Sequence, residues 1–198
     1  MDKTNSQCKK CRRAGEKLFL KGEKCLSPKC PITRRTYAPG MHGSARTGRP
    51  SEYQRQLREK QKLAQIYILS AKELKNYFEK ANKEKGATAA KLFELLERRL
   101  DNAVFRLGLV PSRKAARELI RRKMIHINQR AVTVAGYSLN KNDLIGFSKA
   151  TALPKKVAKF PAWLGQTKDG GVKVMGLPSG ENEDTAVDAN LIVEFYSK

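Results

Sequence analysis

Residues 98–147, around which the rest of the chain is organised, have the sequence RRLDNAVFRLGLVPSRKAARELIRRKMIHINQRAVTVAGYSLNKNDLIGF. Its helical periodicity predicts two helices, and the later alternation of apolar and polar residues predicts short strands separated by turns. Ser112 follows Pro111 and is a good N-cap, so we expect the second helix to begin there. At about 100° per residue, its small and aliphatic residues fall opposite its basic residues. The stretch therefore predicts a helix with one core face and one basic face.

The basic face of this second helix combines Arg113, Lys114, Arg117 and Arg121 with a single acidic residue in the whole helix, Glu118. An ordinary solvated surface is the alternative interpretation, but solvated helix faces usually mix both signs of charge. A stripe of one sign is typical of a face that binds a polyanion. We therefore expect four positive charges in a row on a binding surface.

The charge of the whole chain supports that expectation. Its 198 residues include 41 Lys and Arg against 19 Asp and Glu, a formal net charge of +22. Residues 1–50 hold 13 basic and 3 acidic residues, residues 98–135 hold 10 and 2, and residues 164–198 hold 3 and 6. Nucleic acid is the expected partner, with a protein neighbour for the acidic end. No apolar run of about 18 residues and no signal peptide is evident, which predicts no membrane association and a cytoplasmic location.

Four cysteines, Cys8, Cys11, Cys25 and Cys30, lie within the first 30 residues. Two close pairs separated by a loop have the spacing of a tetrahedral four-thiolate zinc site, and a closed site of this kind is structural rather than catalytic. Reduced free cysteines and an iron–sulfur cluster are the alternatives that spacing leaves open. The intervening residues 14–24 contain two glycines and suit a short hairpin.

Residues 31–61 are rich in Pro, Gly, Arg and Ser, which favours an extended arm at the start of this segment. Its basic and aromatic residues suit phosphate contact and base stacking: Arg34, Arg35, Arg46 and Arg49, with Tyr37 and His42 among them.

The patterns of the remaining segments are typical of structural elements rather than of a binding face. Residues 52–85 predict two helices, with Ser70 as a cap, and residues 88–108 predict one continuous helix that ends at Gly108. Residues 149–163 form a basic, proline-punctuated connector, and residues 189–198 predict a terminal strand rich in β-branched and aromatic residues.

The chain contains no glycine-rich phosphate loop, no G-x-S-x-G and no acid–base set that spacing can nominate. We therefore do not expect an enzyme. An enzyme that modifies RNA and carries an RNA-binding domain is the alternative from another class. A regulator that binds messenger RNA is a third reading.

Several separated strings together identify a resemblance: KLFLKGEKCLSPKC, YAPGMHG, LREKQKLAQIY, LLERRLDNAVFRLG, SRKAARELI and LIVEFYSK. They are similar to the bacterial-type small-subunit ribosomal protein four family, in its four-cysteine form, from Cys8 to the end of the chain. One departure is the hairpin turn at Asn128–Gln129, where the family usually carries Asn-Gly.

The resemblance implies an α+β protein, mostly a helical scaffold. It places a zinc knuckle and basic arm at residues 1–45 and a helical domain at residues 46–95, completed by residues 161–198. An RNA-binding domain of two helices on a short antiparallel sheet is inserted between them, at residues 96–160.

The resemblance also implies a role: a primary binder of small-subunit ribosomal RNA that nucleates assembly of the subunit body and is not a homo-oligomer. It implies contact with ribosomal protein five and other small-subunit proteins, and a contribution to translational accuracy. Arg46 and Arg49 match arginines near the channel through which messenger RNA enters. The expected RNA-binding residues are Arg34, Arg35, Tyr37, His42, Arg99, Arg106, Arg113, Lys114, Arg117, Arg121, Arg122, Lys123 and Arg130.

Overall fold

The computed structural model describes residues 3–45, 48–148, 161–167, 170–180 and 187–197. The chain divides into two compact units, residues 1–76 with 182–198 and residues 77–181, with the boundary inside a helix. Each unit is described by itself. The predictions made for Arg46 and for most of the basic connector, residues 149–160, fall outside the described residues.

The first unit is helical in its described part. Its elements are α1 (Lys3–Ala14), α2 (Glu23–Leu26), α3 (Pro31–Arg34), α4 (Glu52–Ile66), the start of α5 (Ala71–Lys83) and α9 (Ala189–Ser197). The expected hairpin between the cysteine pairs is wrong. Gly15 and Gly22 both have positive φ, but Gly15 ends α1 and Gly22 precedes α2, so the glycines terminate helices rather than turn a hairpin.

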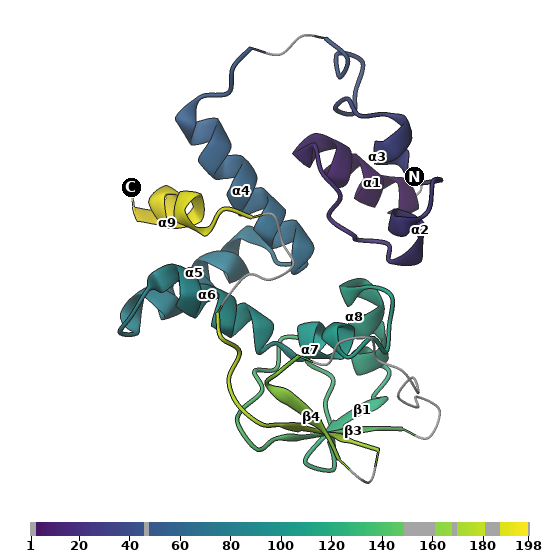
Figure 1. Ribbon diagram of the computed structural model, residues 1–198, viewed down its shortest axis with the longest axis vertical. Helices are drawn as coiled ribbons and strands as arrows, with labels where there is room; N and C mark the ends of the chain where they lie inside the picture. The colour runs from purple at the N-terminus through teal and green to yellow at the C-terminus, as the bar shows by residue number, and fades with distance from the viewer. Residues whose placement is uncertain (1–2, 46–47, 149–160, 168–169, 181–186, 198) are drawn as a thin grey trace. The chain divides into compact units, whose positions relative to one another are not determined.

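The C-terminal segment is a helix, and the prediction of a terminal strand is therefore wrong. Its first turn is capped by Asp188, whose Oδ1 accepts from the Asn190 backbone N–H at 3.0 Å. α9 packs against α4, as Figure 1 shows, with Ile192 fully buried and a 3.0 Å hydrogen bond from Gln56 to Glu194. Burial against a helical partner outweighs the intrinsic strand preference of β-branched residues.

The second unit is a layer of helices on a sheet. In chain order its elements are the end of α5, α6 (Thr88–Glu97), α7 (Leu100–Arg106), α8 (Arg113–Arg121), β1 (Ile125–Ile127), β2 (Arg130–Ala131), β3 (Leu144–Phe147), β4 (Leu164–Gln166) and β5 (Val172–Val174). The strands form an antiparallel sheet in the order β2-β1-β3-β5-β4. α7 and α8 pack together over it, and one buried cluster joins helices and strands. The expected α+β class is confirmed.

The expected single helix over residues 88–108 is wrong, because it breaks between α6 and α7. Arg99 has extended backbone (φ −66°, ψ 137°) and caps α7. The break frees backbone groups to bond a distant segment: Leu100 donates to Tyr137 O at 2.8 Å and Leu139 donates to Arg98 O at 2.9 Å. The predicted start at Ser112 is confirmed, since its Oγ accepts from the Ala115 backbone N–H at 3.3 Å. The helix stop at Gly108, which has φ 68°, is confirmed as well.

The β1–β2 hairpin turns in two residues. Asn128 and Gln129 have φ values of 49° and 69°, and Ile127 pairs with Arg130. Positive φ at both positions is the signature of a type I′ turn, here made without glycine. β4 and β5 were not foreseen from the sequence, and they extend the sheet beyond β3. No helix in the described residues is long and apolar enough to span a membrane.

Candidate nucleic-acid interface

Three buried polar side chains underlie the basic face of α8. Glu97 at the end of α6 is 7% exposed, Asp101 in α7 is 1% exposed and Asn102 in α7 is 0% exposed. Each is bonded to arginines. A buried carboxylate or amide is tolerated only when it is hydrogen-bonded, so these three residues define fixed positions for the guanidinium groups around them.

Asp101 binds two arginines. Arg117 of α8 donates from Nε to Asp101 Oδ2 at 2.8 Å, and Arg99 donates from Nε and Nη2 to the two carboxylate oxygens at 3.1 and 3.0 Å. Arg99 is itself only 3% exposed and also donates to the Tyr77 hydroxyl at 2.7 Å. Burial lowers the pKa of Arg99, but the hydrogen bond and charge of Asp101 outweigh it, so that pKa lies above its ordinary value.

Glu97 and Asn102 hold two more arginines. Arg106 forms a two-pronged pair with Glu97, with Nε–Oε2 and Nη2–Oε1 distances of 3.1 and 3.0 Å. Arg113 donates from Nε to Asn102 Oδ1 at 2.8 Å, and its guanidinium lies 4.5 Å from the centre of the Phe105 ring. We call Arg106, Arg113 and Arg117 the arginine cluster. All three are half-buried, and each is hydrogen-bonded to one of the buried side chains Glu97, Asp101 and Asn102.

The remaining predicted RNA-binding residues of this region are solvent-exposed. Arg121 and Arg122 share Glu118 at 3.4 and 3.1 Å, and their side chains are still 74% and 67% exposed. Lys114, Lys123 and Arg130 are exposed as well. Together with the arginine cluster, these residues concentrate positive charge on α7, on α8 and on the residues that follow α8.

This arrangement changes the expected uniform stripe. Lys114 and Arg121 face solvent, whereas Arg113 and Arg117 turn toward α7 and bond its buried polar groups. Arg99 lies inside the fold. The sequence contains one indication of these buried hydrogen-bond partners, because Asp101 is the only acidic residue in residues 98–117. A lone acid in so basic a segment indicates a buried partner for several arginines.

The start of the basic arm is tied to α1. Arg12 donates from Nε to Tyr37 O at 3.0 Å and from Nη2 to Ala38 O at 3.1 Å. Its guanidinium also lies 4.9 Å from the centre of the Tyr37 ring, which is on a residue that is 44% exposed. Sequence reasoning missed Arg12. The other arm residues expected to bind RNA, apart from Arg46, are exposed: Arg34, Arg35, His42 and Arg49.

The four cysteines come from α1, α2 and the residue before α3. Cys11, Cys25 and Cys30 are buried and Cys8 is half-buried, and all four are free thiols. Burial raises the pKa of the Cys11 thiol, a hydrogen bond with the Leu18 backbone opposes the rise, and the charges of Cys25, Cys8 and Cys30 add to it. Within the described residues, no three potential ligands converge closely enough to hold a metal ion as they are placed.

A basic helix on a small antiparallel sheet, with a second basic segment at the front of the chain, defines a nucleic-acid-binding protein. Residues 2–97 match the ribosomal protein S4/S9 N-terminal domain, and residues 98–145 match the S4 domain. The chain therefore belongs to the small ribosomal subunit protein uS4 family. It is 42% identical to small ribosomal subunit protein uS4 of Syntrophomonas wolfei over 205 residues, 98% of each chain. The corresponding proteins of Frankia alni and Halothermothrix orenii are 44% and 43% identical, over 98% and 96% of each chain.

Proposed function

We propose that this chain binds small-subunit ribosomal RNA through two surfaces, the face of α7 and α8 that carries the arginine cluster and the basic arm at the start of residues 31–61. Family membership supports a ribosomal, non-enzymatic role. The observation that carries the first surface is the buried frame: Glu97, Asp101 and Asn102 each bond an arginine that is half-exposed. These acids and amides orient the arginines without covering them.

Pre-orientation matters because a free arginine loses up to about 2 kcal/mol of side-chain entropy when it is immobilised. An arginine already held through Nε has lost part of that freedom before RNA arrives. The planar guanidinium fork also matches phosphate geometry, which a lysine ammonium does not. We therefore expect the arginine cluster to fix the position of an RNA backbone, while the exposed Lys114, Arg121 and Lys123 add long-range attraction.

The basic arm contributes a stacking surface. One face of the Tyr37 ring lies against Arg12, so the arm is anchored at this point by two backbone hydrogen bonds and one cation–π contact. An exposed aromatic ring of this kind suits an unpaired base, which is how single-stranded RNA segments are commonly bound.

Charge-neutralising variants of the full chain test the first surface. The triple variant K114Q/R121Q/K123Q leaves the buried frame intact and should weaken binding to transcribed small-subunit ribosomal RNA by at least tenfold. The triple variant K72Q/K80Q/K83Q removes the same charge from α5 and is the matched control. Equal weakening by both variants would mean that net charge alone drives binding, and it would overturn the proposed surface.

For the cysteines we propose a structural zinc ion. The chemistry of the donor set fits: four thiols, three of them buried, with the Lys21 backbone N–H already donating to Cys25 Sγ at 3.4 Å. Metal binding would draw the sulfurs together from their present positions. Elemental analysis of the purified chain should find one zinc per molecule; iron with sulfide would indicate the cluster instead, and neither element would refute a metal site.

The more specific roles in the ribosome are supported by the family resemblance alone. We propose that the chain nucleates assembly of the subunit body, contacts ribosomal protein five and contributes to translational accuracy, with Arg46 and Arg49 beside the messenger channel. Reconstitution of the small subunit with the R46A/R49A variant tests the last point. Assembly should proceed normally while binding of structured messenger RNA declines, and a defect in assembly itself would contradict this division of roles.

A further inference from the structure

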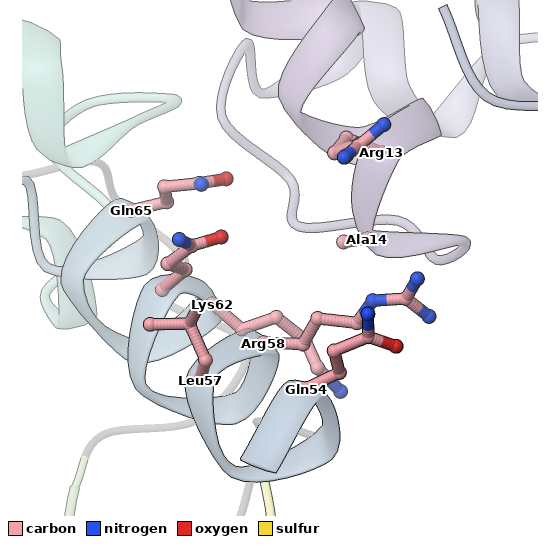
Figure 2. A pocket seen from close by; sticks show the side chains of 8 residues that line it. Arg13, Ala14, Gln54, Leu57, Arg58, Lys62 and Gln65 are labelled. Carbon is pink, nitrogen blue, oxygen red and sulfur yellow. The ribbon is translucent and has the colours of Figure 1, made fainter. Parts of the chain in front are cut away.

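A groove of about 240 Å³ in the first unit lies outside both proposed RNA surfaces. It runs between the C-terminal end of α1 and one side of α4. Figure 2 shows Gln54, Arg58 and Gln65 of α4 pointing across it toward Arg13 and Ala14 of α1. The α4 side chains recur at about one helical turn, so one side of the helix presents a row of long polar groups.

The positive charge of the groove comes from two arginines. Lys62 is bonded to Glu16 at 2.8 Å and to Glu59 at 2.6 Å, so its charge is balanced within the fold. Arg13 and Arg58 are exposed, and neither side chain makes an ion pair or a hydrogen bond to the described part of the chain. The charge of Arg55, one turn before Arg58 in α4, is instead balanced within the helix, because Arg55 pairs with Glu52 at 3.2 Å.

Three glutamine side chains give the groove both hydrogen-bond donors and hydrogen-bond acceptors. Gln54, Gln61 and Gln65 line it, and each side chain has two donors and an acceptor. Gln65 Oε1 is buried and has no hydrogen-bond partner among the described residues. A buried acceptor without a partner is costly, so a rotation of the Gln65 side chain that brings Oε1 to a donor on a ligand in the groove is favoured.

We infer that this groove is a third RNA contact, one that takes a single ribonucleotide, with its phosphate between Arg13 and Arg58 and a hydroxyl or amino group donating to Gln65 Oε1. The inference rests on the proposed function and extends it to α1 and α4. A ribonucleotide combines an anionic group with hydroxyl and amino donors. An acidic protein side chain offers acceptors only, and it would leave Gln65 Oε1 unpaired.

Binding of the full chain to transcribed small-subunit ribosomal RNA, measured over a salt series, tests the inference. Each lost phosphate contact should lower the slope of log affinity against log salt by about one, so R13A/R58A, which removes both partners of one phosphate, should lower it by about one. The control R55A/K72A removes two exposed charges from other faces and should leave the slope unchanged. Q65L should weaken binding roughly fivefold to tenfold with no change in slope, because the lost contact is uncharged.

The outcomes separate this inference from the proposed function. If R13A/R58A keeps the wild-type slope while K114Q/R121Q/K123Q lowers it, the groove binds no phosphate and only the inference fails. If the wild-type chain itself shows a nearly flat salt dependence, both fail. If R13A/R58A binds RNA normally but loses binding to a glutamate-rich peptide, the groove takes a protein segment and the inference is overturned.

Discussion

Arg117 donates a 2.8 Å hydrogen bond from Nε to Oδ2 of Asp101, a residue that is 1% exposed. The same carboxylate binds the buried Arg99, so one acid joins the core of the second unit to its basic face. The single negative charge of Asp101 thereby compensates the buried Arg99 and orients the half-buried Arg117. Stability and RNA binding are coupled at this residue, and the variants below separate the two.

Removing the charge of Asp101 should destabilise the fold. In D101N the guanidinium of Arg99 loses its buried partner, and breaking such a pair costs about 3–5 kcal/mol. The exposed acid Glu118 is the control, since E118Q breaks only surface pairs and should cost at most about 1 kcal/mol. Urea unfolding of the full chain measures both. A smaller loss for D101N than for E118Q would contradict the proposed role of the buried frame.

Replacing Arg117 with lysine should weaken RNA binding although it conserves the charge. Lysine lacks the Nε donor that reaches Asp101 and the planar fork that fits phosphate. We expect R117K to lower affinity about tenfold with an unchanged salt slope, because the charge remains. Filter binding over a salt series measures both quantities. Wild-type affinity in R117K would show that only charge matters at this position.

Glycine at position 129 should stabilise the β1–β2 hairpin. Gln129 has φ 69°, a conformation that costs a non-glycine residue roughly 1 kcal/mol or more. We therefore expect Q129G to raise the free energy of unfolding by about 1 kcal/mol. N128G should instead destabilise, because the Asn128 side chain donates to Asp143 Oδ1 at 3.0 Å and accepts from the Leu144 N–H at 2.9 Å. The same sign of change in both variants would refute this account of the turn.

Alanine at Gly43 should disturb the basic arm without weakening the core. A Cβ at this position would collide with the backbone oxygen of Ala38, next to the anchored Tyr37. A Cβ on Gly48 meets no atom of the described residues within 4 Å beyond its chain neighbours, so G48A is the matched control. G43A should lower RNA affinity several-fold relative to G48A, with both variants unfolding at the same urea concentration. Equal RNA affinities of G43A and G48A would show that the turn at Gly43 does not contribute to RNA binding.

The sequence predicted those features that depend on local chemistry. The Ser112 cap, the Gly108 stop, the alternation in β1 and the short strand β3 each follow from residues in or next to the element. The helix break at Arg99 could not be found this way, because it is stabilised by backbone bonds to residues 135–139 and by Tyr77.

Non-local packing also explains the other differences between the sequence predictions and the structure. The terminal segment has strand-forming residues, but its partner is the helix α4, more than 120 residues earlier in the chain. β4 and β5 are three residues long each; they pair with each other, and β5 also pairs with β3, which lies far from it in the sequence. For the interface, the stripe on α8 was visible in the sequence. The inward turn of Arg113 and Arg117 depends on where α7 places Asn102 and Asp101, which spacing along the chain does not reveal.

The salt dependence of ribosomal RNA binding tests the central claim most directly. If the arginine cluster, the exposed basic residues around it and the arm together engage roughly six to ten phosphates, affinity should fall on the order of a thousandfold or more between about 50 and 200 mM salt. The full chain and transcribed small-subunit ribosomal RNA are sufficient for the measurement. A steep linear decrease of log affinity with log salt is the predicted result, and a nearly flat dependence would contradict the account.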